Sequence, residues 1–254
     1  MIISTGFYYD NEYSGDKNVF KAFTSGGAVT ETFLSSTNNS IFKPRNLIKS
    51  VVQSTEREPL VIPMALYFDE NLDDDNIRAI KKWLYQKDFK ELVFEDQPEK
   101  VFYAKVDGAV NLSHNAIASG YIEFDFIANS AYSFSRMIEL EGQSESIEEY
   151  QTLHVYNEGD LITHPKITIT MNANEATDIE FYNATTNEQL IIKNTLADEK
   201  VMILNEYGEF ETSSNLRYVY DDHIGDFISF AEGVNELQIK GEFTYTIEYQ
   251  NIYL

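Results

Sequence analysis

The chain has 254 residues, of which 43% are hydrophobic and 14% aromatic, a composition that can fill a packed core and is too apolar for a disordered protein. Asp and Glu number 42 against 19 Lys and Arg, and the resulting net charge of -23 repels nucleic-acid phosphates and anionic lipids. The chain has no cysteine, which excludes disulfides, thiolate metal sites and a cysteine nucleophile. We therefore expect a folded protein that neither binds nucleic acid tightly nor inserts into a membrane.

The first half of the sequence predicts strands around one amphipathic helix. Met1 to Lys49 is typical of short strands with long loops, and a clearer strand covers Leu60 to Phe68. The helix is expected to begin at Asp73 or Asp74, where a carboxylate can cap free backbone N–H groups, and to extend to about Gln86. Its apolar residues share one face and form the expected helix core: Ile77, Ile80, Trp83 and Leu84.

Two further features of this half indicate a sheet beneath the helix. The runs Leu92–Phe94 and Val101–Val106 flank an acidic turn that contains Pro98, as in a pair of antiparallel strands. Gly120 to Ile127 alternates apolar and polar side chains, which predicts a half-buried strand.

A domain boundary is expected between Ser133 and Gln151, where the sequence becomes rich in Glu, Ser and Gln. Beyond it no helical period returns, and short strands separated by Asn-, Gly- and Asp-bearing turns predict a β-sandwich. These strands are expected at 166–171, 179–182, 190–193, 200–205, 237–240 and 243–249. The predicted organisation is a first domain at 1–135, completed by 250–254, then a linker at 136–150 and a second domain at 151–249.

The sequence contains no motif for catalysis, cofactor binding or metal binding. It has no phosphate-binding glycine loop, nucleophile elbow or paired-histidine helix. The histidines are scattered without ligand spacing: His114, His154, His164 and His223. The acidic runs Asp73–Asp75 and Asp221–Asp222 lack the spacing of a calcium loop, and they are better explained by a helix N-terminus and a solvated loop. We expect no enzyme activity, no cofactor and no metal.

One loop has residue types that suit contact with a ligand or a partner protein. Tyr218, Tyr220 and His223 lie close together in the sequence beside Asp221, and exposed tyrosines can stack on sugar rings or pack in interfaces. A plain surface loop is the alternative.

Several segments resemble the distal tail proteins of long-tailed bacteriophages. In the first half the resemblance lies in 77–84, 92–104, 120–126 and 129–132, with Ala131 standing where the family pattern has proline. In the second half it lies in 156–160, 164–170 and 229–241. The resemblance implies a mainly β fold with one substantial helix: an N-terminal ring-forming domain of β-sandwich or split-barrel type and a C-terminal galectin-like β-sandwich.

The resemblance also implies a function and a set of partners. Distal tail proteins form a hub in the virion tail tip, usually a homo-hexameric ring that lets DNA pass, and they are made in the bacterial host cytoplasm. The implied partners are the tail tube protein, a tail-tip or tail-fibre-like protein, a receptor-binding or accessory baseplate protein, and cell-wall saccharide. The family's chain returns to the first domain at its end, which implies that Ile252, Tyr253 and Leu254 pack there.

Two other functions remain open at this point. A carbohydrate-binding protein would use the sandwich itself to bind cell-wall saccharide. A cell-wall polysaccharide hydrolase would need a converging pair of carboxylates, and the sequence indicates no particular pair. Because β-sandwiches serve all three functions, the predicted fold does not decide between them.

Overall fold

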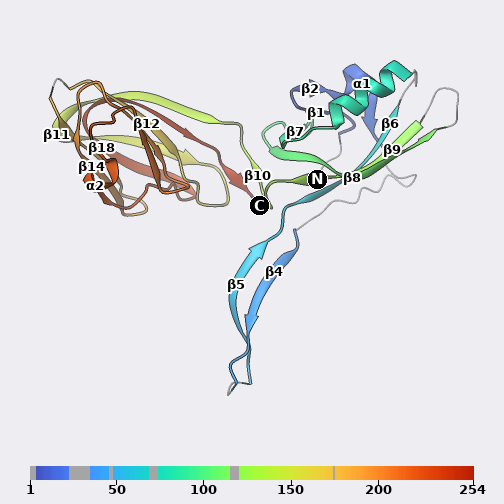
Figure 1. Cartoon of the computed structure of the whole chain (residues 1–254), viewed down its shortest axis with the longest axis horizontal. Coiled ribbons are helices and arrows are strands. Elements are labelled where there is room, and N and C mark those ends of the chain that lie inside the picture. The colour runs from blue at the N-terminus through green and yellow to red at the C-terminus, as the bar shows by residue number, and fades with distance from the viewer. Residues whose placement is uncertain (1–3, 23–34, 46–47, 69–73, 115–119, 174) are drawn as a thin grey trace. The chain divides into compact units, whose positions relative to one another are not determined.

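The computed structural model describes residues 4–22, 35–45, 48–68, 74–114, 120–173 and 175–254. The chain divides into two compact units, Met1–Phe134 and Ser135–Leu254 (Figure 1). The fold class expected from the sequence is confirmed, because strands dominate both units and the described residues contain one helix longer than a single turn. None of the described helices is long and apolar enough to cross a membrane.

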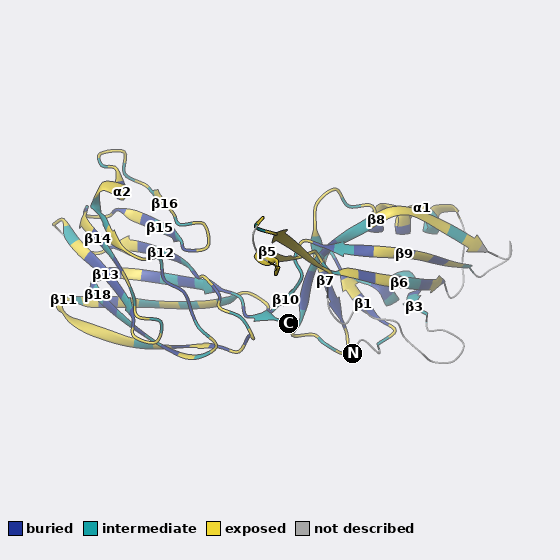
Figure 2. Ribbon diagram, turned by 90° about the horizontal axis from the view of Figure 1, so that it is seen from below, coloured by how far each residue is buried: buried dark blue, intermediate teal, exposed yellow. Residues whose placement is uncertain are grey.

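The first unit is built on an antiparallel sheet with the strand order β2-β1-β7-β8-β9-β6-β3, and β10 pairs with β8. Its elements are β1 (Phe7–Tyr9), β2 (Glu12–Tyr13), the 3-10 turn η1 (Ser14–Lys17), β3 (Val19–Lys21), β6 (Val61–Phe68), β7 (Lys90–Phe94), β8 (Val101–His114), β9 (Gly120–Ala128) and β10 (Ser133–Phe134). Along β6 and β9 buried and exposed side chains alternate, so that one face of each strand enters the core. Figure 2 shows this alternation as changes of colour along both strands.

Helix α1 (Asp74–Leu84) covers one face of this sheet. Ile80, Trp83 and Leu84 are buried, whereas Ile77 is only partly buried. The Trp83 indole stacks on Phe7 at 5.7 Å between ring centroids, and its Nε1 donates a hydrogen bond to the Tyr9 carbonyl at 2.9 Å. This bond satisfies the indole N–H inside an apolar core and fixes the helix to β1.

The helix differs slightly from the prediction at its end. Asp73 lies outside the described residues, and the helix ends at Leu84, two residues before Gln86. Gln86 instead turns back on the last turn, where its side-chain Nε2 donates to the Trp83 carbonyl at 3.0 Å. This bond satisfies a carbonyl that the helix itself leaves free.

The first unit also contains a separate two-stranded sheet, β4 (Thr37–Phe42) paired with β5 (Val51–Arg57). Every residue of both strands is exposed. The hairpin therefore adds nothing to the core of this unit.

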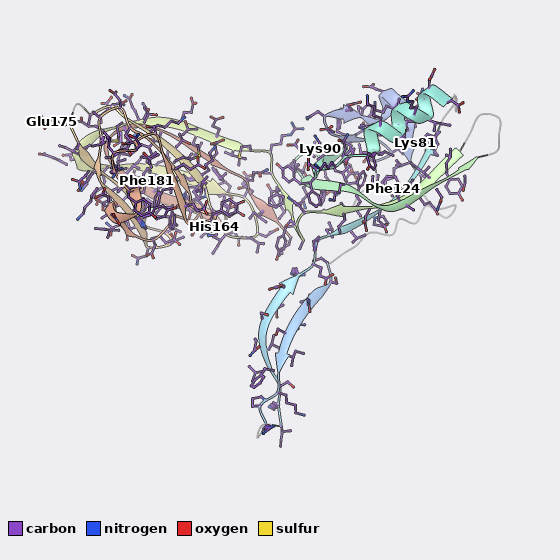
Figure 3. The ribbon with its side chains drawn as sticks, in the orientation of Figure 1. Lys81, Lys90, Phe124, His164, Glu175 and Phe181 are labelled. Carbon is purple, nitrogen blue, oxygen red and sulfur yellow. The ribbon has the colours of Figure 1, made fainter. Side chains whose placement is uncertain are left out.

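The second unit is a β-sandwich with the strand order β16-β15-β12-β18-β13-β14-β17, and β11 pairs along β18. Its elements are β11 (Ile138–Asn157), β12 (Lys166–Met171), β13 (Thr177–Asn183), β14 (Glu188–Thr195), β15 (Lys200–Leu204), β16 (Glu209–Thr212), α2 (Val219–Asp222), β17 (His223–Gly225), β18 (Gly233–Tyr249) and β19 (Ile252–Tyr253). The sandwich encloses an apolar core that includes Phe181, Phe230 and Phe243. Figure 3 places Phe181 among these strands.

One long strand lies at the centre of the single eight-stranded sheet that forms the sandwich. The first half of β18 pairs with β13, and the second half pairs with β12. Between the two halves, Gly241 has φ of +135°, and a Cβ at this position would lie 3.1 Å from the Asp178 carbonyl oxygen. Only glycine adopts this backbone angle readily, so Gly241 lets β18 continue from its pairing with β13 to its pairing with β12. The prediction of two separate strands, 237–240 and 243–249, was therefore wrong.

The expected linker at 136–150 was also wrong, because residues 138–150 form the first part of β11. Ile138 to Ser146 pair with Tyr249 to Gly241, and Gln151 to Asn157 pair with Ile239 to Gly233. The register shifts between Ser146 and Gln151. The polar composition that suggested a linker reflects a strand whose side chains are mostly exposed.

The C-terminal residues are held by two segments of the second unit. Ser135 N donates to the Asn251 carbonyl at 2.9 Å, and Asn251 N donates to the Ser135 hydroxyl at 2.9 Å. Asp160 N donates to the Ile252 carbonyl at 2.8 Å, and Leu254 N donates to the Asp160 carboxylate at 2.9 Å. Packing of Ile252, Tyr253 and Leu254 against the first domain stays a prediction.

An aromatic cluster in the second unit contains His223, Phe210 and Phe227. The His223 imidazole lies 4.9 Å from the Phe210 ring and 5.3 Å from the Phe227 ring, measured between centroids. Its Nε2 is buried without a hydrogen-bond partner. Desolvation lowers the pKa of His223 and outweighs the opposite effect of the nearby Asp226 carboxylate.

We predict that Leu84→Ala lowers the free energy of unfolding of the first unit by about 2–5 kcal/mol, the usual cost of emptying a buried leucine site. Leu84 is 6% exposed and belongs to the core under α1. Denaturant unfolding followed by tryptophan fluorescence measures this directly, because Trp83 is the single tryptophan and lies in the same core. An unchanged unfolding midpoint would contradict the packing of α1 on the sheet.

We predict that His223 makes the second unit less stable as the pH falls. Because the folded state lowers the pKa of His223, the unfolded chain binds its proton first, and stability is lost as the pH falls below about 6.5, the ordinary histidine value. His223→Phe removes this titration and keeps an aromatic ring between Phe210 and Phe227. The melting temperature of the wild type should fall more between pH 8 and pH 5 than that of the variant, and equal losses would refute the prediction.

Candidate functional site: interaction surfaces

The histidines and acidic runs do not form a reactive centre among the described residues. His154 and His164 are exposed in the second unit, and Figure 3 labels His164. His223 lies in the aromatic cluster, and the side chain of His114 is outside the described ones. In the described part of the chain, no three His, Asp or Glu side chains are grouped so that they could hold a metal ion.

The loop expected to contact a ligand does bring its tyrosines together. The Tyr218 and Tyr220 rings lie 5.2 Å apart and are 64% and 40% exposed, whereas His223 points into the cluster with Phe210. The Tyr220 hydroxyl also accepts a hydrogen bond from Phe210 N at 3.0 Å, which ties that tyrosine to the strand beneath it. Tyr218 is thus the tyrosine that is more accessible to a ligand or a partner protein.

A buried ion pair holds this loop in place. The Arg217 guanidinium donates from Nε to both oxygens of Glu199, at 3.2 and 3.0 Å, and from NH1 to Asp222 at 3.0 Å. Glu199 is only 3% exposed, and it also accepts a hydrogen bond from Leu196 N at 2.8 Å. A charge-assisted network of this kind fixes the backbone on both sides of Tyr218.

The hairpin of β4 and β5 is a second surface. The sequence predicted only short strands with long loops up to Lys49, and β5 lies beyond that segment. Its strands expose Phe42, Val51 and Val52 by about half and Ile41 by 61%, and Ile48 between the strands is 97% exposed. Phe42 and Val51 are opposite each other in the register. Figure 2 draws β5 as exposed. A two-stranded hairpin without a core is only marginally stable in water, so these apolar side chains suit burial against another surface.

The hairpin is also basic, in contrast to the rest of the chain. Residues 37–57 contain Lys43, Arg45, Lys49 and Arg57 against Glu56, so the segment carries 4 − 1 = +3. The remaining residues then carry −23 − 3 = −26. The hairpin combines exposed apolar side chains with the charge opposite to that of the rest of the molecule.

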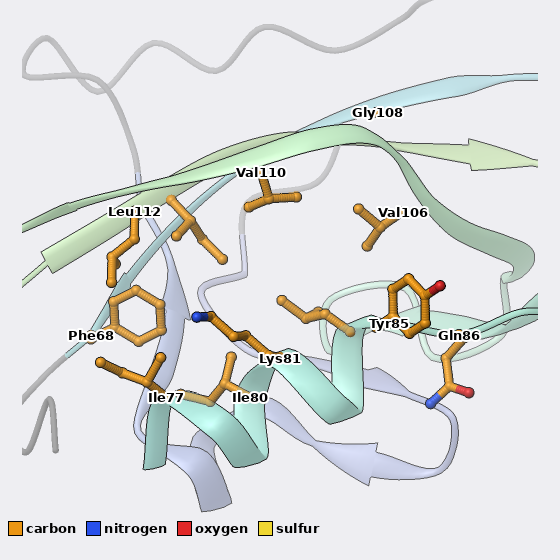
Figure 4. Close-up of a pocket in the computed structure, with 12 residues that line it drawn as sticks. Phe68, Ile77, Ile80, Lys81, Tyr85, Gln86, Val106, Gly108, Val110 and Leu112 are labelled. Atoms are coloured by element: carbon orange, nitrogen blue, oxygen red, sulfur yellow. The ribbon is translucent and has the colours of Figure 1, made fainter. Parts of the chain in front are cut away.

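A third surface is an apolar groove of about 430 Å³ in the first unit. It lies between α1 and the strands β8 and β9, and Ile77, Val110 and Leu112 are among its lining residues (Figure 4). Ile77 borders this groove and is only partly buried. Ile80 and Leu84 also line the groove, but they are buried in the core as well. Tyr85 at the end of α1 is 87% exposed.

Residues 2–249 match two family models of phage tail proteins. Residues 2–130 match the model described as a phage tail protein N-terminal domain, and residues 131–249 match the phage tail C-terminal domain. A relative from Bacillus subtilis (strain 168), the SPbeta prophage-derived uncharacterized protein YomH, is 22% identical over an alignment of 255 positions that covers 98% of this chain and 97% of the relative.

Two solved structures share the fold. The SPP1 Dit (gp 19.1) protein, described as a paradigm of the hub adsorption apparatus in phages infecting Gram-positive bacteria, is 12% identical with a TM-score of 0.68 over 98% of this chain and 99% of that chain. A chain of the phage P2 baseplate, in its activated conformation with Ca, is 9% identical with a TM-score of 0.50 over 97% of both chains.

The resemblance to distal tail proteins is confirmed at two levels. The domain models, which together span residues 2–249, show the family, and the structural matches at this low identity show the fold. The chain therefore belongs to the phage tail proteins defined by this pair of N-terminal and C-terminal domains, has the fold of the SPP1 Dit protein, and is a structural component of a phage tail.

Proposed function

We propose that the protein is the hub of the tail tip and assembles as a homo-hexameric ring through which DNA passes. In this role it joins the tail tube protein to a tail-tip or tail-fibre-like protein and to receptor-binding or accessory baseplate proteins. It is made in the host cytoplasm, acts in the virion and performs no catalysis. The fold shared with a Dit protein supports the role in the tail tip. The exposed β4–β5 hairpin is the feature that supports self-assembly.

The hairpin supports assembly because its own unit leaves it unburied. All thirteen residues of its strands are exposed, and five large apolar side chains between Ile41 and Val52 have no core to enter. Packing such side chains against a second copy removes apolar surface from water, at about 25 cal/mol per Å². The same surface left in water would favour aggregation.

The charge distribution supports the same conclusion. Six copies carry 6 × −23 = −138, so a ring closes only where opposite charges meet at the contacts. The hairpin brings +3 to each contact with a molecule whose other residues sum to −26. Attraction between the hairpin and a neighbouring copy would offset part of the repulsion.

We predict that the purified protein has the mass of a hexamer in solution, about 175 kDa from six chains of 29.2 kDa. Phe42→Ser with Val51→Ser should dissociate it, because losing two anchoring apolar side chains costs roughly 2 kcal/mol or more per contact. That cost corresponds to an affinity about thirtyfold weaker or more. Light scattering after size exclusion measures the mass.

A matched control separates assembly from folding. Tyr156→Ser removes a side chain that is similarly exposed, at 54%, but lies on β11 of the second unit, and it should leave the hexamer intact. All variants should keep the melting temperature of the isolated chain, since none of these side chains is buried. A hexamer that survives the hairpin substitutions would rule out the hairpin as the contact.

We also predict that the assembled protein does not retard double-stranded DNA at about 50 mM salt, where phosphate contacts are strongest. A channel that conducts DNA works best with acidic or neutral walls, because Lys or Arg facing it would hold the phosphates by releasing their counterions. Gel retardation of the wild-type protein is the measurement. Tight binding would show that the basic hairpin faces the channel instead of a neighbouring subunit.

A further inference from the structure

The sheet of the first unit has two faces, and α1 packs on only one of them (Figure 1). Along β6 and β9 the side chains between the buried ones point to the opposite face and are mostly exposed. This open face contains Val61 and Tyr67 of β6, Tyr121, Glu123 and Asp125 of β9, and Asp107 of β8. An antiparallel sheet can leave one face in water, so exposure alone does not indicate a partner. The composition of the open face does.

Apolar side chains occupy both ends of the open face. Tyr67 and Tyr121 are cross-strand partners and are 38% and 47% exposed, and the Phe20 ring of β3 lies 5.6 Å from that of Tyr67. Val61, at the other end of β6, is 40% exposed. Aromatic side chains are enriched in protein interfaces, where their burial supplies much of the binding energy. The open face therefore offers apolar surface to a partner protein.

The open face is also acidic, and its charges repel one another. Asp107 and Asp125 are directly opposite in the register of β8 and β9, and Glu123 precedes Asp125 by two residues on the same face. Like charges in this position are destabilising. In the residues that the structure describes, none of these three carboxylates takes part in an ion pair. Lys105 of β8 instead lies 4.7 Å from the centroid of the Phe89 ring. A basic partner would relieve the repulsion.

The β4–β5 hairpin matches the open face in both respects. Phe42 and Val51 are cross-strand partners, so they point to the same side of the hairpin, where both are about half exposed. Lys43 follows Phe42 directly and Lys49 precedes Val51 by two residues, so positive charges flank this apolar pair. The strands also match in length, because β5 has seven residues and β6 has eight.

We propose that the hairpin of one copy packs on the open face of a second copy, as one sheet packs on another. Its apolar pair covers Tyr67 and Tyr121, and its lysines meet the carboxylates. This contact rests on the ring proposed above and adds the surface that receives the hairpin. The groove beside α1 suits the hairpin less well, because the charged residue in its lining is Lys81.

A charge swap tests the contact. The face-reversed variant, Glu123→Lys with Asp125→Lys, should raise the Kd of assembly at least tenfold, and so should Lys43→Glu with Lys49→Glu. The four substitutions together restore opposite charges and should return the Kd to within about threefold of the wild type, because groups in contact have non-additive effects. Analytical ultracentrifugation at about 50 mM salt, where charges are weakly screened, measures the assembly.

Two controls separate the contact from net charge and from folding. Glu139→Lys with Glu141→Lys changes the net charge equally at exposed positions of β11, and it should leave assembly unchanged. The face-reversed substitutions should leave the melting temperature equal or higher in the background of the two hairpin serine substitutions, where the chain is dissociated. In that variant Asp107 has a lysine opposite it in place of an aspartate.

Cross-linking locates the contact, and because the chain has no cysteine, introduced pairs are the only thiols. Val51→Cys with Tyr121→Cys should give a ladder of covalent multimers on a denaturing gel. The linker is a bismaleimide that spans about 10 Å, the spacing of packed sheets. Val51→Cys with Tyr207→Cys, at a tyrosine that is 68% exposed in the second unit, should give no ladder.

Three results would overturn this contact without refuting the ring. If the hairpin serine substitutions dissociate the hexamer and the face-reversed variant leaves it intact, the hairpin is a contact whose acceptor lies elsewhere. If the face-reversed hexamer retards double-stranded DNA, the open face lines the channel. If the four substitutions together fail to restore assembly, the lysines do not meet the carboxylates. A wild-type protein that stays monomeric would refute the proposed ring, and this contact with it.

Discussion

The pairing of β11 with β18 is the constraint on which the second unit depends. β18 pairs with β13 before Gly241 and with β12 after it, and β11 follows β18 through both halves. The inward face of β18 keeps its alternation across Gly241, from Leu237 to Tyr249. A substitution at Gly241 would therefore disturb the pairing on both sides of it, and the bulge of β11 lies beside the same residue.

Local patterns in the sequence were sufficient for much of this fold. The spacing of Ile80 and Leu84 locates the helix, and the alternation from Gly120 to Ile127 locates β9, because burial of one face imposes a period that the sequence must show. The continuity of β18 could not be predicted in the same way. Gly241 looks like a turn residue, and only its partners on β12 and β13 show that the strand continues.

β11 shows why a polar segment can be mistaken for a linker. Its 20 residues include five glutamates and no Lys or Arg, and most of its side chains are exposed. Within the described structure β11 pairs only with β18, and charged side chains on such an edge oppose pairing with another molecule. The glutamates that make β11 polar therefore also protect its edge from pairing with another molecule. Tyr150 does not stand out in the sequence, because its contacts are with Glu180 and Lys240 on other strands.

The hairpin and the remainder of the chain differ in net charge and in the exposure of their apolar side chains, and this difference bears on function. In the cores of both units apolar side chains are buried, and the chain outside the hairpin is strongly acidic. In the hairpin Phe42 and Val51 face water, and the neighbouring charges are basic. A surface that is unfavourable in the monomer and attractive to the acidic exterior of the same protein favours contact between copies. Because each copy carries both the hairpin and the acidic residues, a head-to-tail arrangement can continue from copy to copy until it closes, which is the geometry of the ring that we propose.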